Sequence, residues 1–91
     1  MKANAIGIIE GDSYGFITAG LDAMLKEANV KVVKYEVVGG MWLAAYVAGD
    51  INAVQAAVSK ALATAKQIPS IHSRGVVISN PAPEFLRLYD L

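Results

Sequence analysis

The side chains that could do acid–base or metal chemistry are few in this sequence and lie far apart. The single histidine, His72, lies in a polar loop with no second ligand or base at useful spacing. Glu10 and Glu36 lie on or beside expected strands without an evident partner, so we expect structural hydrogen bonds there. With no cysteine, the chain lacks thiolate ligands and disulfides. We predict no catalytic residue, no metal site and no cofactor, hence a protein that is not an enzyme.

Phosphate-binding motifs are also absent from the chain. Gly7 and Gly11 do not form a GxGxxG or GKS/T pattern. A small hydrolase of the acylphosphatase type needs an arginine near the first strand, whereas the only arginines are Arg74 and Arg87. Eight basic and eight acidic residues cancel, and no block of like charge marks a surface for nucleic acid. Nucleic acid is therefore not an expected partner.

Local patterns in the first half predict a strand, a helix and a β-hairpin. The apolar run at 5–9 predicts a covered strand, and Asp12 or Ser13 would cap a helix over 14–28. Segments 30–38 and 41–48 read as strands joined by a tight turn at Gly39-Gly40, because glycine tolerates positive φ. The apolar stripe of the helix is Ile17, Leu21, Met24 and Ala28, and its polar stripe is Thr18, Asp22, Lys26 and Asn29.

The second half predicts a helix, a strand and a short terminal helix. Asp50 would cap a helix over 51–66, whose many alanines allow close approach to another element. Pro69 and Ser70 lie in a loop before a strand at 75–79, and a helix over 84–91 follows, with Pro83 near its start. The order favours an α+β, ferredoxin-like βαββαβ fold: an antiparallel sheet, two helices on one face and a short C-terminal helix. We expect one domain over 1–91, with a core at about 4–81 and a tail at 82–91.

The composition predicts self-association. Hydrophobic residues make up 55% of the 91 residues, and a domain of this size buries only ~60–65% of its unfolded surface. The excess apolar surface is most simply covered between copies. A membrane is not an expected partner, because the apolar run at 41–48 is far below the ~20 residues that span a bilayer. The run at 5–9 is too short for a signal-peptide core, and the lack of cysteine fits the cytoplasm.

Read in this order, the motifs resemble the bacterial microcompartment shell proteins of the single-domain, hexamer-forming class (BMC domain). The resemblance runs from about Ala5 to Pro81, with the elements in the right order and at nearly the right spacing. Each matching segment is weak by itself, and their joint order and spacing carry the resemblance. The matching residues are Ala5-Ile6-Gly7-Ile8-Ile9-Glu10, Asp22-Ala23-Met24-Leu25-Lys26, Ala28-Asn29-Val30, Tyr35-Glu36, Gly39, Gly49-Asp50, Ala53-Val54 and Ala56-Ala57.

The resemblance implies a structural role and two functional surfaces. Six copies would form a flat cyclic hexamer, and hexamers would tile, together with other shell proteins, into a shell around cargo enzymes in the bacterial cytoplasm. Lys26 matches the lysine at the hexamer edge, where Asn29 and Asn80 are also expected. The expected pore-lining residues are Gly39, Gly40 and Met41, past which small metabolites would move. Family prevalence favours a metabolosome with an aldehyde-like intermediate.

The sequence departs from the family pattern at both surfaces. The family usually has Pro-Arg-Pro-His after the last strand, and Asn80 stands in place of that arginine, so edge contacts should differ. The usual pore turn, Gly-Ser-Gly, is here Gly39-Gly40-Met41, which lacks the hydroxyl ring. Backbone N–H groups would then face the pore and favour anions or polar neutral solutes, in a wider and less polar opening that Met41 or Trp42 could narrow.

One alternative function shares this order of elements. A ligand-binding regulator of the ACT or PII type would also be ferredoxin-like, but it would form dimers or trimers and bind a metabolite between subunits. The mass of the native oligomer distinguishes the two functions. Trp42 and Tyr46 lie on the same face of their strand, where packing in the core or in an interface is the expected role.

Overall fold

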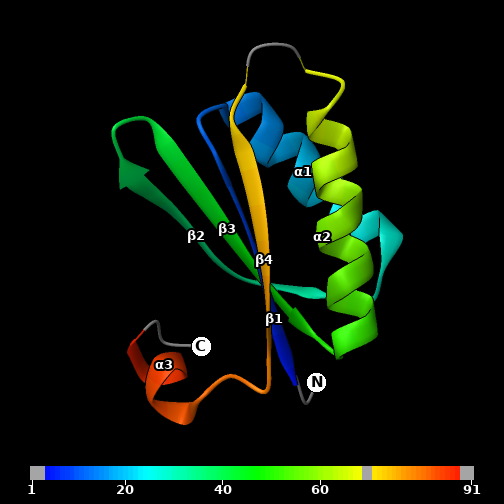
Figure 1. Cartoon of the computed structure of the whole chain (residues 1–91), viewed down its shortest axis with the longest axis vertical. Helices are drawn as coiled ribbons and strands as arrows, with labels where there is room; N and C mark the ends of the chain where they lie inside the picture. Colours follow the sequence, from blue (N-terminus) through cyan, green and yellow to red (C-terminus); the bar gives the residue numbers. More distant parts are fainter. Residues whose placement is uncertain (1–3, 69–70, 89–91) are drawn as a thin grey trace.

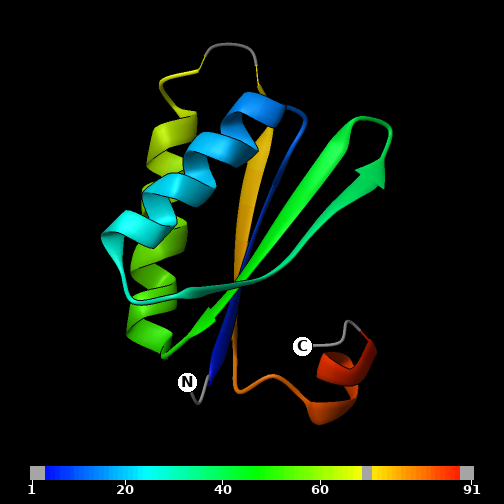
Figure 2. The ribbon, with the colours of Figure 1, turned by 180° about the vertical axis from the view of Figure 1, so that it is seen from behind.

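A four-stranded antiparallel sheet forms the centre of the molecule, with its strands in the order β2-β3-β1-β4. The structure is a computed structural model that describes residues 4–68 and 71–88. Helices α1 and α2 cover one face of the sheet, while α3 lies on the other side (Figures 1 and 2). The elements are β1 (Ala5–Gly11), α1 (Tyr14–Glu27), β2 (Lys31–Gly39), β3 (Trp42–Gly49), α2 (Ile51–Ala65), β4 (Ser73–Ser79) and α3 (Pro83–Leu88). The predicted ferredoxin-like βαββαβ order is confirmed.

Side-chain caps fix where the two long helices begin. Ser13 Oγ accepts a hydrogen bond from the Phe16 N–H at 3.1 Å, which caps α1. Asp50 Oδ1 accepts bonds from the Asn52 and Ala53 N–H groups at 2.9 and 3.2 Å and caps α2. Both caps occupy donors that a helix start leaves unpaired. Within the described residues, no helix is long and apolar enough to cross a membrane.

The main core lies between the sheet and the two long helices. Glycines at Gly7 and Gly75 bring the sheet close to α2, because a Cβ at either position would lie under 3.0 Å from a valine of that helix. On α2, Ala57, Ala61 and Ala65 are buried, which confirms the close packing predicted from its alanines. The largest fully buried side chains are Phe16, Ile9, Ile17, Met24, Val47 and Val54.

A second, smaller core lies on the opposite face, which we call the open face because neither long helix covers it. The buried members are Ile6, Ala44, Tyr46 and Ala48. Leu86 of α3 packs against this cluster, together with Ile8 and Val33. The short C-terminal helix therefore covers part of the open face, at the end of the sheet where the N-terminus lies (Figure 1).

Element boundaries differ from the sequence prediction where strands pair over long distances. β1 extends through Gly11, which pairs with Leu43 and Ser73, so β4 also begins at Ser73 rather than at 75. The expected loop at Pro69 and Ser70 lies outside the described residues. Helix α3 begins at Pro83 and is described to Leu88, and residues 89–91 of the expected tail helix also lie outside the described residues.

Candidate functional site

The turn expected to line a pore lies at the tip of the β2–β3 hairpin. Gly39, Gly40 and Met41 have φ values of +111°, +57° and +70°. Gly39 pairs with Trp42, so the two turn residues are Gly40 and Met41, one position later than predicted. Two positive φ angles in a two-residue loop follow the type I′ pattern, whose twist matches that of the flanking strands. The predicted strand start at Met41 is therefore wrong: β3 begins at Trp42.

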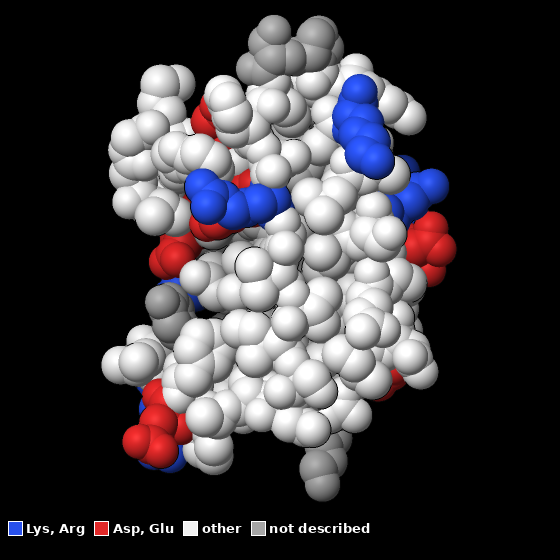
Figure 3. All heavy atoms as spheres, viewed as in Figure 1, with Lys and Arg blue, Asp and Glu red and all other residues white. Residues whose placement is uncertain are grey.

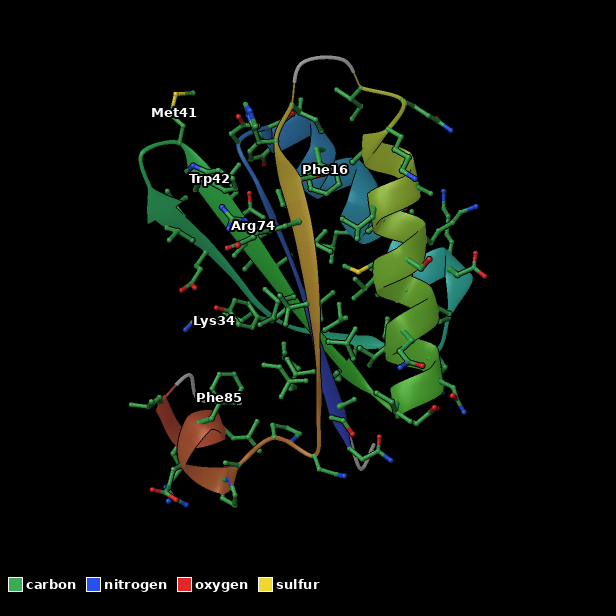
Figure 4. All side chains as sticks on the ribbon, in the orientation of Figure 1. Phe16, Lys34, Met41, Trp42, Arg74 and Phe85 are labelled. Carbon is green, nitrogen blue, oxygen red and sulfur yellow. The ribbon has the colours of Figure 1, made fainter. Side chains whose placement is uncertain are left out.

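The turn is open to solvent and carries no charge. No atom lies within 4 Å of a Cβ built on Gly39 or Gly40. Met41 is 79% exposed, and Figure 4 shows its side chain at the tip of the hairpin, pointing away from the sheet. A turn of this kind is held by its own backbone, so side chains there can change with little effect on the core.

The residues expected at a hexamer edge lie on the surface. Lys26 Nζ lies 2.8 Å from Asp22 Oδ2, one helical turn earlier, and both side chains are exposed. The hydrogen bond to Asp22 raises the pKa of Lys26, so the lysine stays charged. Asn29 is exposed just before β2. Asn80 follows β4 with φ +48°, and its N–H donates to the Asn4 carbonyl at 2.7 Å.

The structure brings Asn29 and Asn80 to one end of the sheet and the turn to the other. Four chain segments lie side by side at this end: the Asn29 carbonyl approaches Gly49, the Asn4 N–H donates to the Gly49 carbonyl, and Asn80 bonds Asn4. Lys26 lies in the last turn of α1, three residues before Asn29. Strand β3 has eight residues, and at ~3.3 Å per residue it separates the two ends by roughly 23 Å. The two expected functions thus occupy separate surfaces.

A charged and aromatic cluster on the open face was missed by the sequence analysis. The guanidinium carbon of Arg74 lies 4.9 Å from the centroid of the Trp42 ring. Arg74 Nε also lies 3.0 Å from Glu10 Oε1, and Glu10 pairs with Arg74 across β1 and β4. Glu10 has no evident partner in the sequence, but in the structure it forms an ion pair with Arg74. The signal was available: a βαββαβ order makes the first and last strands neighbours, so Glu10 and Arg74 could face each other.

Two further contacts give the remaining candidate acids structural roles. Glu36 Oε1 accepts a hydrogen bond from the Tyr46 hydroxyl at 3.0 Å, which confirms the structural bond expected of Glu36. Asp12 binds His72 twice: Oδ1 accepts from the backbone N–H and Oδ2 pairs with Nδ1, both at 2.8 Å. The bond from the His72 backbone N–H, followed by the side-chain bond, lowers the pKa of Asp12.

These arrangements lack the features of a reaction centre in the part of the chain that the structure describes. No three histidine, cysteine, aspartate or glutamate side chains within residues 4–68 and 71–88 are grouped to hold a metal ion. No polar or charged residue in the same ranges is buried.

Apolar surface remains exposed on the hairpin and at one edge of the sheet. Val37, Val38 and Tyr35 of β2 are 70, 57 and 43% exposed, and Val76 of β4 is 48% exposed. The space-filling view shows a broad uncharged area over β4 and the adjoining part of α2, with charged residues at its margins (Figure 3). The exposed apolar side chains of β2 and β4 are candidate sites of association.

Comparison with known proteins identifies the fold and its relatives. The BMC domain profile matches residues 5–81. The shell protein PduA of Salmonella typhimurium is 32% identical over 77 residues, which cover 85% of this chain and 82% of PduA. The carboxysome shell protein CcmK2 of Synechococcus elongatus is 39% identical over 64 residues, covering 70% of this chain and 63% of CcmK2.

Other relatives are longer than the matched region. The carboxysome assembly protein CcmO of Synechococcus elongatus is 34% identical over 85 residues, 93% of this chain but 30% of CcmO. A crystal structure of a microcompartment protein from Desulfitobacterium hafniense superposes with a TM-score of 0.76 at 28% identity, and the match covers 90% of this chain and 44% of that one. The chain therefore spans less than half of each of these two proteins.

Proposed function

Because the chain belongs to the BMC-domain family of microcompartment shell proteins, we propose that six copies assemble into a cyclic hexamer and that hexamers tile into a shell facet. The match over residues 5–81, nearly the whole described fold, is the observation that carries this proposal. The protein acts by assembly and selective passage rather than by catalysis. Its partners are its own copies, other shell proteins and enclosed enzymes, and it works in the bacterial cytoplasm.

The exposed apolar surface supports association between copies. Val37 and Val38 project from a hairpin that extends past the helix layer (Figure 2). Val76 lies on the edge strand β4, beside the uncharged area of Figure 3. The hairpin surface and the β4 surface lie at different places on the molecule. A contact between the hairpin of one copy and β4 of the next is therefore head-to-tail. Repeated head-to-tail contacts close into rings when the rotation per copy allows it.

The hairpin tip is the proposed lining of the ring's central opening. Each group in the turn is repeated six times around a sixfold axis, so Gly40 contributes six backbone N–H groups and neither Gly39 nor Gly40 contributes a side chain. Such N–H groups favour anions and polar neutral solutes. Of the two residues that could narrow the opening, Trp42 is held by Arg74 on the open face. Met41, at the exposed tip, is therefore the residue that limits the diameter of the opening.

Lys26 is the proposed contact between neighbouring hexamers. Its ammonium has three donors, and Asp22 takes one of them in the isolated chain. Carbonyl groups of an adjacent hexamer would take the others while the aliphatic stem is covered. Asn29 and Asn80 complete this edge with uncharged amides, and Asn80 replaces the arginine usual in the family. The absence of that second cation makes the edge depend more strongly on Lys26.

The oligomer and its tiling are tested separately. Native mass spectrometry is expected to give six copies per particle, and a dimer or trimer would refute the hexamer. Electron microscopy of Lys26→Ala is expected to show intact hexamers whose sheets are lost or reorganised. Lys60→Ala is the matched control, since Lys60 is also an exposed helix lysine with an acidic neighbour, Glu27 at 4.0 Å. Normal sheets from Lys26→Ala would refute the edge assignment.

The pore is tested by adding a charge at the turn. Gly40→Asp would place six carboxylates around the axis, so permeation across a planar bilayer is expected to shift toward cations. Thr18→Asp, which adds the same charge on the exposed side of α1, is the control and is expected to leave selectivity unchanged. Equal selectivity in the two variants would refute the role of the turn.

A further inference from the structure

A shallow depression lies at the end of the sheet that carries the hairpin, beside the start of β3 and the start of β4. It is lined by Trp42, Ile71, His72, Ser73 and Arg74. Trp42 begins β3, and Ser73 and Arg74 begin β4, so rigid strands position three of the five residues. Figure 4 shows Trp42 and Arg74 next to each other at this end of the sheet. None of these residues belongs to the proposed pore lining or hexamer edge, so a role for the depression does not depend on those assignments.

Arg74 is fixed from two directions and still presents a donor edge. Its guanidinium lies over the Trp42 ring at 4.9 Å, and its Nε lies 3.0 Å from Glu10 Oε1. The side chain is nevertheless 64% exposed. A guanidinium has five N–H donors, and the fork formed by its two terminal nitrogens matches the two oxygens of a carboxylate. The contacts with Glu10 and Trp42 therefore orient a fork for a planar anion.

The lining next to Arg74 in the chain adds an imidazole. Asp12 holds the His72 ring through Nδ1 at 2.8 Å, which leaves Nε2 as the other polar atom of a side chain that is 79% exposed. Ser73 lines the depression and is partly buried. Ile71 also lines the depression, while its side chain packs against the main core and so anchors this part of the lining. The apolar ring of Trp42 thus lies close to the polar groups of Arg74 and His72, a combination that is common in ligand sites.

The local charge limits which anions fit. Glu10 and Asp12 are both close to the depression, through Arg74 and His72 respectively. Two carboxylates repel a phosphate or any other multiply charged anion, since like charges a few ångströms apart disfavour binding. A single carboxylate bound in the plane of Arg74 adds only one negative charge and gains two charge-assisted hydrogen bonds. The ring of an aromatic acid would then lie along Trp42.

We propose that the depression formed by Trp42, Ile71, His72, Ser73 and Arg74 is a binding site for small planar monocarboxylates, with Arg74 as the carboxylate receptor. The site lies on the surface of the fold, and one of its residues, Trp42, directly follows the hairpin turn. It gives the protein a way to hold an acid at its surface that is separate from passage through an opening.

The single tryptophan makes this site directly observable, because Trp42 is the only one in the chain. The assembled wild-type protein is titrated with sodium benzoate through the millimolar range, exciting only the indole. Saturable change in Trp42 fluorescence is expected, together with a shift of the single indole N–H resonance in NMR. Inorganic phosphate and benzyl alcohol are titrated in parallel, and each is expected to bind at least about tenfold more weakly, because each lacks one of the two recognised groups.

Variants of the two arginines decide whether Arg74 is the receptor. Arg74→Gln is expected to weaken benzoate binding about tenfold or more, since hydrogen bonds to charged groups are lost. Arg74→Lys keeps the charge but not the fork and is expected to fall between this variant and wild type. Arg87→Gln, which alters the exposed arginine on α3, is expected to bind as wild type. The proposal is overturned if benzoate leaves Trp42 unchanged, if Arg74→Gln binds as well as wild type, or if phosphate binds as well as benzoate.

Discussion

Substituting alanine for Gly7 tests how closely the sheet and α2 are packed. A Cβ built on Gly7 lies 2.7 Å from Val54 Cγ1, 2.8 Å from Val58 Cγ2 and 3.3 Å from Val47 Cγ2. All three valines are buried, and none is more than 5% exposed. Valine has a stiff χ1 angle, so these methyl groups cannot swing away without leaving a rotamer minimum. Gly7→Ala must therefore displace α2 or strain its side chains.

The contacts allow the magnitude to be estimated. Two contacts fall under 3.0 Å, and an off-rotamer side chain costs about 0.5–1.5 kcal/mol, which gives a total strain of about 1–3 kcal/mol, the range observed for overpacked cores. Alanine also restricts the unfolded chain, which returns about 0.4–1 kcal/mol. Gly7→Ala is therefore expected to lower the free energy of unfolding by about 0–2.6 kcal/mol, with a central value of about 1.3 kcal/mol that corresponds to a fall in Tm of roughly 5–10 °C at ~4–8 °C per kcal/mol.

Gly15→Ala is the matched control, because it makes the same chemical change without a close contact. Gly15 lies in the first turn of α1, and the nearest atom to an added Cβ is Ser13 Oγ at 3.6 Å. Helix propensity and the unfolded chain then favour alanine by about 0.4–1 kcal/mol. The two variants are compared by urea unfolding and thermal melts at one protein concentration, since assembly adds to apparent stability. Gly7→Ala as stable as Gly15→Ala would refute the packing argument.

Three other substitutions test contacts at the turn, the loop and the open face. Met41→Asn is expected to raise the free energy of unfolding by about 0.5–1 kcal/mol in urea melts, because asparagine tolerates the φ of +70° and the exposed methionine loses little packing. Asp12→Asn is expected to destabilise the protein at neutral pH. The lowered pKa of Asp12 means that its carboxylate stabilises the fold above its ordinary value of 3.8 and stops doing so as the pH falls below it, so melts of the two proteins should converge in acid. Tyr46→Phe removes the hydroxyl that donates to Glu36 and is expected to cost about 1 kcal/mol, measured in the same melts; no loss would show that water replaces the bond.

Local sequence was sufficient to predict the elements and their order. Periodicity placed Ile17 and Met24 in the core and Lys26 on the surface, and the caps of both long helices were readable from Ser13 and Asp50. These features depend on residues within a few positions of one another. The position of the turn was missed by one residue, because Met41 adopts a left-handed conformation that propensity assigns to glycine.

The candidate binding site was beyond local reasoning. Arg74 meets Glu10 and Trp42, and His72 meets Asp12 across 60 positions of the chain. Such pairs depend on strand register, which the hydrophobic pattern fixes only after the sheet order is known. The resemblance to shell proteins gave no indication of them either, because of these residues only Glu10 belongs to the matching segments, and the match does not include its partner Arg74.

Two β-bulges in β2 affect whether another strand can add to this edge of the sheet. The register between β2 and β3 shifts between Val32 and Lys34 and again between Val37 and Gly39, which leaves the stretch Lys34–Val37 in uninterrupted pairing. β2 is an edge strand, and an unbroken edge is a template for another strand to add to the sheet. Bulges bend the edge and interrupt its row of donors and acceptors. The β2 edge is therefore a poor template for strand addition, so crowding of copies along this edge does not extend the sheet into amyloid-like fibres.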